Sequence, residues 1–543
     1  MSTPTADVVI NGPIYRGDAV RGWSQSMAIA GDRIVALGSE SEVAQHIGPG
    51  TRVINAQGKM IVPGFQDAHI HAPFAGLNRL HVLLNDLPGR EAYLATIKAY
   101  ADANPDKAWI IGGGWAMDHF PGGLPTKEDL DSIVPDRPVF LFNRDVHGAW
   151  VNSKALEIGG ITKDTPDPWD GRIERNEAGE PSGMLHEGAA YTFNEKIVPL
   201  PDQATWQAAI LNAQEHLHSL GITGWQDAWV IEGTLNAYKS LAESGQLTAR
   251  VVGALWWDRH AGLEQLDKFR AQREYGRAGK FHPTTVKIMT DGVLENYTGA
   301  LMQPFCDGCG GHTDNYGLSY VDHDELAAAV TALTGEQFQV HMHTIGDRAV
   351  RNALDAAEAA IAAHGRHDLR HHLAHIQLVQ PEDIPRFREL DIVANCQAYW
   401  ANFDPQMNVL TVPFLGQERV DLSYPFNSLL TNGTVLAMGS DWSVSTADPL
   451  AQMEVAVTRI GPLYRDQPAF LPHEAIPLAA ALNGFTNGTA YVNHDEDEAG
   501  SFAVGKRADV VILDQDLFKA EHVSDAHVEL TMASGQVVYD ILA

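Results

Sequence analysis

Short apolar runs alternate with longer helix-like stretches through most of the chain, a pattern typical of a β/α barrel. Two of the longer stretches, 322–333 and 349–364, are rich in alanine or leucine and are followed by Gly335 and Gly365, as helices often are. The apolar runs predict eight parallel strands, within residues 59–71, 221–226, 250–257, 285–289, 337–343, 370–375, 392–397 and 434–441. The sequence therefore predicts an α/β fold, a (β/α)8 barrel of the TIM type.

Both ends of the chain show a different pattern, with short β-like runs separated by turns. Near the N-terminus they lie at 7–10, 26–29, 33–37 and 52–54, and near the C-terminus at 508–513, 528–532 and 537–539. Neither end has enough strands for a stable core of its own. We therefore expect residues 1–58 and 485–543 to form one small composite β-sandwich domain, with the barrel spanning residues 59–484.

The stretch from about residue 77 to 205 is too long for a single connection between a barrel strand and its helix. It contains strand-like runs at 108–112 and 138–142 and many prolines and glycines. We interpret it as an insertion after the first barrel strand, placed at the barrel mouth, where it would shape a substrate pocket.

The charge of the chain indicates which kinds of molecule the protein can bind. The 543 residues carry a formal net charge of −31, which argues against nucleic acids and anionic membranes, because both bind basic surfaces. The N-terminus lacks the basic start and apolar core of a signal peptide, and no apolar run reaches membrane-spanning length. We therefore expect a cytoplasmic protein whose partner is a small molecule. The sequence leaves a homo-oligomer open.

The chain has three cysteines, which fits a reducing compartment better than a disulfide scaffold. Cys306 and Cys309 form a single CxxC in a glycine-rich loop, with His312 close by. A lone CxxC lacks the second pair of ligands that a structural zinc site needs. A loop without metal is the simpler interpretation, and a metal or redox role stays an alternative.

Histidine and aspartate residues stand where several of the predicted strands end. His69 and His71 follow the first apolar run and, two residues apart, point to the same side of a strand, so both can bind one ion. His343 ends the fifth strand, His375 the sixth and Asp441 the eighth. Because the C-terminal ends of barrel strands surround one mouth, these nitrogen and oxygen ligands can hold zinc or a similar divalent ion there.

Lys287, on the fourth strand, is unexpected beside metal ligands, because an ammonium group repels cations. A neutral lysine amine, however, reacts with carbon dioxide to form a carbamate, an anion with two oxygens that can bridge two ions. The alternative is an ordinary lysine that pairs with Asp291 or Asp441. With the carboxylated lysine as bridge, we predict two divalent ions, taken to be zinc, held by His69, His71, Lys287, His343, His375 and Asp441.

The chemistry predicted for such a centre is hydrolysis. Two divalent ions lower the pKa of a bridging water to near neutrality, and the resulting hydroxide attacks a carbonyl carbon. Asp441 accepts the proton of the water and passes it to the leaving nitrogen. Asp441 and Lys287 are therefore the predicted catalytic residues. An amide bond is the natural target, because its nitrogen departs poorly without protonation.

Other histidines of these strands are expected to lie away from the mouth. His341 shares a face with His343 but lies one layer deeper, where we expect it to be hydrogen-bonded in the core. On the sixth strand, alternation places His371 and His375 on one face, so His372 is expected to point outward.

These residues and the segments around them resemble the amidohydrolase superfamily. The similar segments include VPGFQDAHIH, HTIGDRAV, LAHIQLVQPEDIPRF, GSDWSVSTADPL and GKRADVVILD. With RDVHGAWVNSKAL and GEPSGMLHEGA in the insertion, they resemble amidohydrolase family 3, the branch of the N-substituted formamide deformylases and the AepA-like proteins. The resemblance implies a (β/α)8 barrel with a composite β-domain and hydrolysis of amide-type bonds, often with zinc. It also implies one ion on His69, His71 and Asp441, a second on His343 and His375, and carboxylated Lys287 between them.

One departure argues against a mononuclear deaminase. Such members of the superfamily place a glutamate three residues after the histidine of strand five, where this chain has Gly346. We predict an EC 3.5-type enzyme that hydrolyses an N-substituted formamide or a related small amide. The alternatives are a hydrolase of cyclic amides or N-acyl amino acids, and a non-catalytic regulatory or binding protein on the same fold. The predicted substrate contacts are Trp115, His147, Glu295 and Tyr297.

Overall fold

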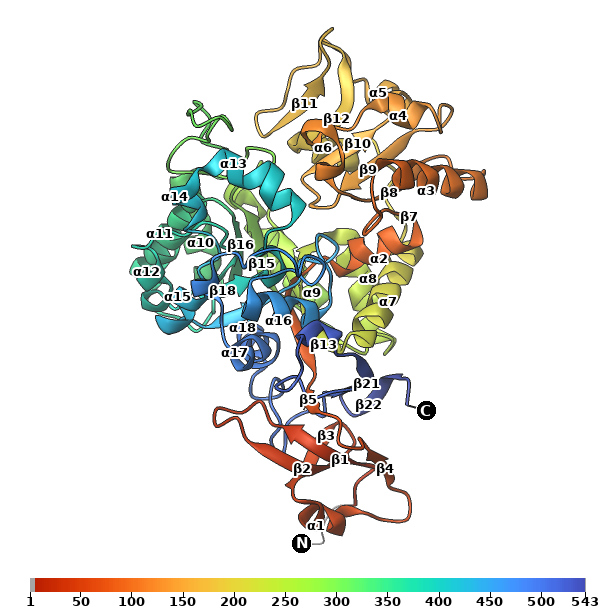
Figure 1. Ribbon diagram of the computed structural model, residues 1–543, viewed down its shortest axis with the longest axis vertical. Helices are drawn as coiled ribbons and strands as arrows, with labels where there is room; N and C mark the ends of the chain where they lie inside the picture. The colour runs from red at the N-terminus through yellow and green to blue at the C-terminus, as the bar shows by residue number, and fades with distance from the viewer. Residues whose placement is uncertain (1–4, 543) are drawn as a thin grey trace.

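The computed structural model describes residues 5–542, and its centre is an eight-stranded parallel barrel (Figure 1). The strands are β6 (Phe65–Ile70), β13 (Ile222–Val230), β14 (Arg250–Trp256), β15 (Phe281–Met289), β16 (Gln339–Thr344), β17 (His372–His375), β18 (Val393–Cys396) and β19 (Leu436–Met438). They are hydrogen-bonded in the order β19-β18-β17-β16-β15-β14-β13-β6. The first and last strands meet where the Asp441 amide donates to the His69 carbonyl at 2.7 Å, so the barrel is nearly closed. The predicted barrel fold is confirmed.

Helices cover the outside of the barrel, in the stretches where helical patterns predicted them. One of them, α10 (His323–Gly335), begins after Asp322, whose side chain accepts a hydrogen bond from the Asp324 amide. Another, α11 (Asp347–His364), ends at Gly365, whose φ of 77° suits glycine. No helix within residues 5–542 is long and apolar enough to cross a membrane. Further helices around the barrel are α7 (Gln203–Ser219), α8 (Glu232–Glu243), α9 (Leu266–Gly276), α12 (Ile384–Glu389) and α15 (Phe426–Thr431).

The alternation of side chains along β16 explains why the barrel interior is polar. Val340 and Met342 point outward and belong to the large apolar cluster beneath the helices. His341 and His343 point inward, where His341 bonds to a glutamine of another strand and His343 lines a cavity. The apolar side chains of this strand thus stabilise the barrel, and its polar side chains point into the barrel interior.

The two ends of the chain build one mixed sheet, as predicted. Its strands are β1 (Val8–Tyr15), β2 (Trp23–Ala30), β3 (Arg33–Gly38), β4 (Arg52–Asn55), β5 (Ile61–Pro63), β20 (Val510–Leu513), β21 (Val528–Ala533) and β22 (Gln536–Asp540). They follow the order β22-β21-β20-β5-β1-β2-β3, with β4 paired to β1. Ile10 and Ile29 share one apolar cluster with Val510 and Met532, so neither end has a core without the other.

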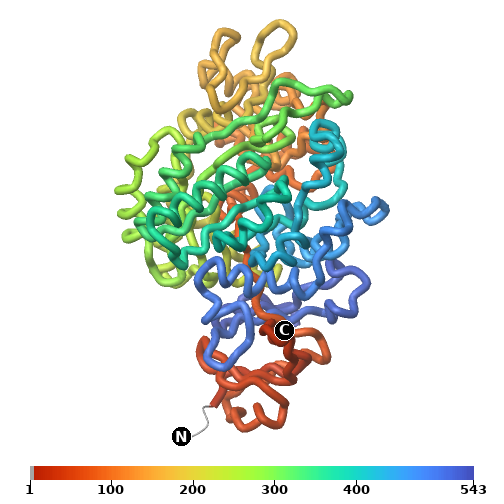
Figure 2. The backbone as a smooth tube through the Cα atoms, turned by 90° about the vertical axis from the view of Figure 1, so that its left-hand side faces the viewer, coloured from red at the N-terminus to blue at the C-terminus, as the bar shows by residue number. Residues whose placement is uncertain are grey.

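The insertion forms a third sheet over the barrel mouth. Its strands are β7 (Val82–Leu83), β8 (Ile110–Trp115), β9 (Val139–Asn143), β10 (Gly148–Val151), β11 (Gly171–Arg175) and β12 (Pro181–Glu187). They are hydrogen-bonded in the order β11-β12-β10-β9-β8-β7, and β8 and β9 match the two strand-like runs of the sequence. Figures 1 and 2 show this sheet at one end of the molecule and the sheet of the chain ends at the other, with the barrel between them.

Candidate metal centre

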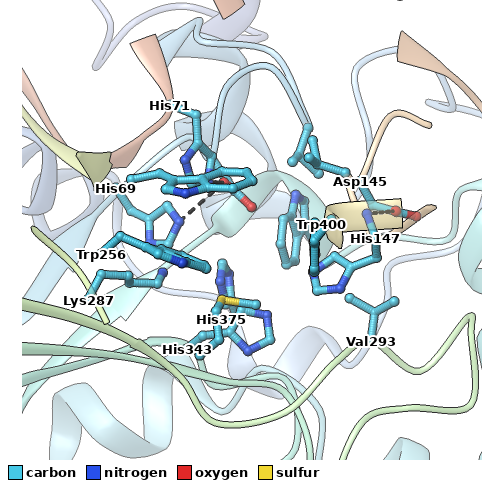
Figure 3. Close-up of a pocket in the computed structure, with 16 residues that line it drawn as sticks. His69, His71, Asp145, His147, Trp256, Lys287, Val293, His343, His375 and Trp400 are labelled. Carbon is cyan, nitrogen blue, oxygen red and sulfur yellow. Dashed lines mark hydrogen bonds and ion pairs between the residues drawn. The ribbon is translucent and has the colours of Figure 1, made fainter. Parts of the chain in front are cut away.

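The predicted metal ligands converge on one cavity of ≈ 50 Å³ at the barrel mouth (Figure 3). They reach it from different strands, because each strand ends at the same side of the barrel. Most of the remaining wall is apolar or aromatic, including Trp229, Trp256 and Trp400. The residues that line the cavity include all the predicted ligands, which are His69, His71, Lys287, His343, His375 and Asp441.

His69, His71 and Asp441 form a group of ligand atoms at one side of this cavity. Asp441 Oδ1 lies 3.2 Å from His69 Nε2 and 2.9 Å from His71 Nε2. One ligand atom from each residue lies within 4.8 Å of the others, and within residues 5–542 no other group of three His, Cys, Asp or Glu side chains does so. His69 Nε2, His71 Nδ1 and Asp441 Oδ1 are buried without a hydrogen-bond partner. Such atoms are costly to bury, and a bound divalent cation would satisfy His69 Nε2 and Asp441 Oδ1, which lie 3.2 Å apart.

His343 and His375 face the same cavity from β16 and β17. Their ring centroids are 4.5 Å apart. His343 Nδ1 lies 3.0 Å from Asp291 Oδ1, which leaves Nε2 for a ligand. The carboxylate of Asp291 is held in place by the amides of Ile345, Gly346 and Ala300. His375 Nδ1 is buried and makes no hydrogen bond, so these two imidazoles also fit a metal site.

Lys287 lies on β15 between the two groups of ligands. Asp291 and Asp441, the ion-pair partners considered for it, pair with histidines instead. Burial lowers the pKa of Lys287 to about 7, although the charge of Asp441 opposes this. A large fraction of the amine is therefore neutral at physiological pH, which is the form that reacts with carbon dioxide.

The electrostatics of the site favour neutral imidazoles and an ionised carboxylate. Burial lowers the pKa of His69 to about 3 and holds those of His343 and His375 well below the ordinary value. Burial raises the pKa of Asp441, but the facing His69 and His71 outweigh it and hold this pKa well below its ordinary value. Neutral imidazole nitrogens and carboxylate oxygens are the protonation states in which these groups bind metals.

A layer of polar residues supports His69 from below, as expected for His341. The Nε2 atom of His341 lies 2.8 Å from His69 Nδ1, and its Nδ1 atom lies 2.8 Å from Gln226 Oε1. Gln226 in turn donates to Gln339 Oε1 on β16. This series of hydrogen bonds fixes the orientation of the His69 ring, so that Nε2 faces the cavity.

The expectation for His372 was wrong. His372 is fully buried inside the barrel, 4.0 Å from the His341 ring between centroids, and lies 3.1 Å from Asn395 Nδ2. His371 instead points to the helices and accepts a hydrogen bond from the Val340 amide. The cause is the end of β17, where His375 has a φ of 75°. This backbone breaks the two-residue alternation, so His372 and His375 both face inward although they are three residues apart.

The family of the chain follows from its match to known proteins. The model of the amidohydrolase family matches residues 52–539. The chain belongs to the amidohydrolase family. This amidohydrolase is 32% identical to Protein LONG AFTER FAR-RED 3 of Arabidopsis thaliana, over 94% of this chain and 88% of that protein. It is 27% identical to the N-substituted formamide deformylase of Arthrobacter pascens, over 94% of this chain and 93% of that enzyme.

A solved structure resembles this amidohydrolase over nearly its whole length. It is the crystal structure of an uncharacterized metal-dependent hydrolase from Pyrococcus furiosus, with a TM-score of 0.72 and 27% sequence identity. The match covers 94% of this chain and 100% of that one. These matches confirm the predicted membership in amidohydrolase family 3, the branch of the N-substituted formamide deformylases.

The insertion adds a charged pair to the metal cavity of the amidohydrolase. His147, a predicted substrate contact, lines the cavity, and its Nδ1 lies 2.8 Å from Glu187 Oε2. Burial lowers the pKa of His147, but the adjacent Glu187 outweighs it and raises this pKa to about 9. Burial likewise raises the pKa of Glu187, but His147 and the hydroxyl of Thr298 lower it to about 2. His147 therefore presents a cationic ring beside the ligands.

The other predicted substrate contacts lie outside the metal cavity. Glu295 lines an adjoining cavity, where its Oε1 accepts from Thr411 Oγ1 at 2.7 Å. Trp115 is fully buried in the core of the insertion, and its indole donates to the Leu141 carbonyl. Tyr297 packs edge-on against Phe305 and Phe414 and lines neither cavity. The positions of Trp115 and Tyr297 therefore do not support their predicted contact with a substrate.

Trp229, which was not among the residues predicted from the sequence, stacks on Trp256 with ring centroids 4.8 Å apart and lines the metal cavity. Trp229 lies at the C-terminal end of β13, three residues beyond the run that predicted this strand. The rule that strand ends face the mouth would have found it. Asp145 and Tyr191 also line the cavity, but they come from the insertion, whose docking has no signal in the sequence.

The CxxC loop forms no assembled metal site. Cys309 is exposed, and Cys306 Sγ lies 4.0 Å from His312 Nδ1 and accepts from Arg419 Nη2 at 3.4 Å. The three side chains do not bring their ligand atoms within 4.8 Å of one another.

Proposed function

We propose that this amidohydrolase uses bound divalent metal ions to hydrolyse a C–N amide-type bond of a small molecule, an N-substituted formamide or a related amide. The reaction consumes one water and releases a carboxylic acid and an amine. The observation that supports it is the group of His69, His71 and Asp441, each of which brings one ligand atom within 4.8 Å of the others at the barrel mouth.

Two zinc ions are the proposed cofactors, because the donors are imidazoles and carboxylates. His69, His71 and Asp441 would hold one ion, and His343 and His375 the other. Metal ions bound there supply Lewis acidity, which lowers the pKa of water and polarises a carbonyl group. Lys287 would bridge them as a carbamate. In that step the neutral amine attacks the carbon of carbon dioxide, a C–N bond forms while one C=O π bond opens onto oxygen, and the nitrogen loses a proton to water.

Asp441 is the proposed proton carrier. Its carboxylate faces the cavity and stays ionised at neutral pH, because His69 and His71 lie beside it. It can accept a proton from water and return it to the nitrogen of the departing amine. Trp229, Trp256 and Trp400 line the cavity in which this transfer would take place.

We also propose that the protein works in the cytoplasm on a small-molecule partner. All three cysteines are free, which agrees with a reducing compartment.

Metal content and a panel of amides test the proposed function. The protein is reconstituted with zinc, its metal content is measured by mass spectrometry, and amine release is followed with N-substituted formamides, N-acyl amino acids and cyclic imides. We expect release from at least one class, loss of activity after chelation, and recovery when zinc is restored. A metal-loaded protein that is inert toward every amide, ester and lactam would support the regulatory alternative instead.

A further inference from the structure

The metal cavity adjoins a much larger one, here called the side chamber. The metal cavity measures ≈ 50 Å³ and the side chamber ≈ 300 Å³. Asp145, Val293, Trp400 and Val444 line both spaces, so the two cavities adjoin at these side chains. One water molecule needs about 10–15 Å³ of such space, so the metal cavity has room for a short acyl group and little more. The remaining part of a substrate must extend into the side chamber.

The wall of the side chamber that is not exposed carries four charged residues. They are Arg144, Asp145, Glu295 and Asp404. Arg79 and Asp86 also line the chamber, but both side chains are exposed, and Arg79 bonds to Asn212. Arg144 is therefore the one inward-lying lysine or arginine in the lining of this chamber.

Arg144 has unused hydrogen-bonding capacity. Its Nη2 donates to Gln406 Oε1 at 2.6 Å, and no other acceptor within residues 5–542 takes its guanidinium hydrogens. Asp404, Asp118 and Asp145 attract it only from beyond ion-pair distance. A guanidinium carries five N–H donors in a rigid planar fork, which matches a carboxylate. Most of this fork is thus available to a ligand.

The three acidic residues of the chamber that are not exposed each accept a local hydrogen bond. Asp145 Oδ1 accepts from the His147 amide, Asp404 Oδ1 from the Met407 amide, and Glu295 Oε1 from Thr411 Oγ1. Burial raises the pKa of all three carboxyls. The guanidinium of Arg144 stays charged at any physiological pH.

We propose that the side chamber binds the amine portion of the substrate and that Arg144 binds a carboxylate carried on it. The substrates are then N-formyl or other short N-acyl derivatives of amino carboxylic acids. This inference rests on the proposed amide hydrolysis and names its substrate class. Arg144 determines specificity by pairing with the carboxylate, while the short acyl group lies beside the metal ligands.

Three probes that lack a scissile bond test the role of Arg144 on the zinc-loaded protein. Phenylpropionate, phenylpropanol and phenylpropylamine share a body and differ in the charge of the end group, and calorimetry measures their binding. We expect the carboxylate to bind at least about tenfold more tightly than the alcohol. Arg144→Gln should abolish this preference, and Arg90→Gln, which changes an exposed arginine of the insertion, should keep it.

Two outcomes would overturn the inference. Tighter binding of the amine would show that the carboxylates of the chamber dominate, and a carboxylate preference that survives Arg144→Gln would place the anion on the metal ions. Kinetics provide the second measurement. The kcat/KM ratio of N-formylphenylalanine to N-formylphenethylamine should fall at least about tenfold in Arg144→Gln, through KM. Because the probes cannot be hydrolysed, absence of turnover would contradict the proposed function alone, and the binding result would still decide the role of Arg144.

Discussion

Contacts with neighbouring residues hold Asp441 in an unusual backbone conformation. Its φ of 53° lies in the left-handed region, which costs a residue other than glycine about 1–3 kcal/mol. Its amide donates to the His69 carbonyl, and its carboxylate lies between the rings of His69 and His71. The contacts between the first and last barrel strands therefore hold Asp441 in a conformation that its own sequence would not favour.

We expect Asp441→Asn to reduce kcat by at least about 100-fold with the fold intact, because an amide has the same shape but cannot carry the proton. Amine release from an N-substituted formamide measures the loss, and circular dichroism tests the fold. Asp497→Asn, at an exposed position, is the matched control. Turnover close to that of the wild type would remove Asp441 from the proton transfer.

We expect Lys287→Ala to lose most of the bound metal and to regain part of its activity when a short carboxylic acid is added, because the acid can replace the missing bridge. Metal content by mass spectrometry and kcat with added acetate are the measurements. Lys519→Ala, whose side chain is 82% exposed, should behave as the wild type. Full metal and full activity without any additive would exclude the bridging role.

At the scale of elements, the insertion is joined to the barrel through the end of β12. Glu187 is fully buried there, and its two oxygens accept from His147 and from Thr298 Oγ1. The Asn296 side chain donates to the His147 carbonyl and adds a second link. Thr298 and Asn296 thus hold the pair of His147 and Glu187, and with it the insertion sheet, over the metal cavity.

We expect Glu187→Gln to lower the free energy of unfolding by about 3 kcal/mol, because it leaves His147 buried without its counter-charge. The contribution of protonated His147 to the stability of the fold is complete below its ordinary pKa of 6.5 and is lost as the pH rises through about 9. The Glu187 contribution is complete above 4.5 and is lost as the pH falls through about 2.

The difference in the free energy of unfolding between the wild type and Glu187→Gln should therefore be largest at about pH 6 and clearly smaller at about pH 10. Urea unfolding at the two pH values measures it. Glu177→Gln, an exposed change in the turn between β11 and β12, is the control. A difference that does not depend on pH would show that the pair is not charged in the folded protein.

At the scale of the whole molecule, the metal centre depends on the closure of the barrel. His69 and Asp441 come from the two strands at the ends of the barrel sheet, β6 and β19 with its following loop. Gly439 allows their close approach, since a Cβ at this position would lie 2.7 Å from both the Cβ and the backbone nitrogen of His69. The backbone must therefore shift if any side chain is added there.

We expect Gly439→Ala to lower metal affinity at least about tenfold and to reduce the unfolding temperature by a few degrees, because it pushes His69 away from Asp441. Zinc titration and differential scanning calorimetry test both effects. Gly50→Ala, where a Cβ meets nothing within 4 Å, is the control. Unchanged metal affinity would mean that barrel closure does not set the geometry of the site.

The sequence by itself determined the eight apolar runs and the residues that end the strands, because these depend on neighbours along the chain. It also predicted that the two chain ends form one domain, because neither end has enough strands for a core of its own. His69, His343 and Asp441 each follow an apolar run, and a barrel brings strand ends together whatever lies between them. Boundaries were less well predicted. The eighth strand is only Leu436–Met438, and the second extends to Val230 and so carries Trp229 to the mouth.

Only the tertiary structure decided which of the remaining residues face the cavities. His372 faces inward because the backbone at His375 breaks the strand alternation. Trp115 is a core residue of the insertion, whereas His147 reaches the metal cavity. For His147 the physical reason is a contact between segments far apart in the chain, since the Asn296 side chain donates to the His147 carbonyl at a separation of 149 residues. No local pattern of polar and apolar residues contains such contacts.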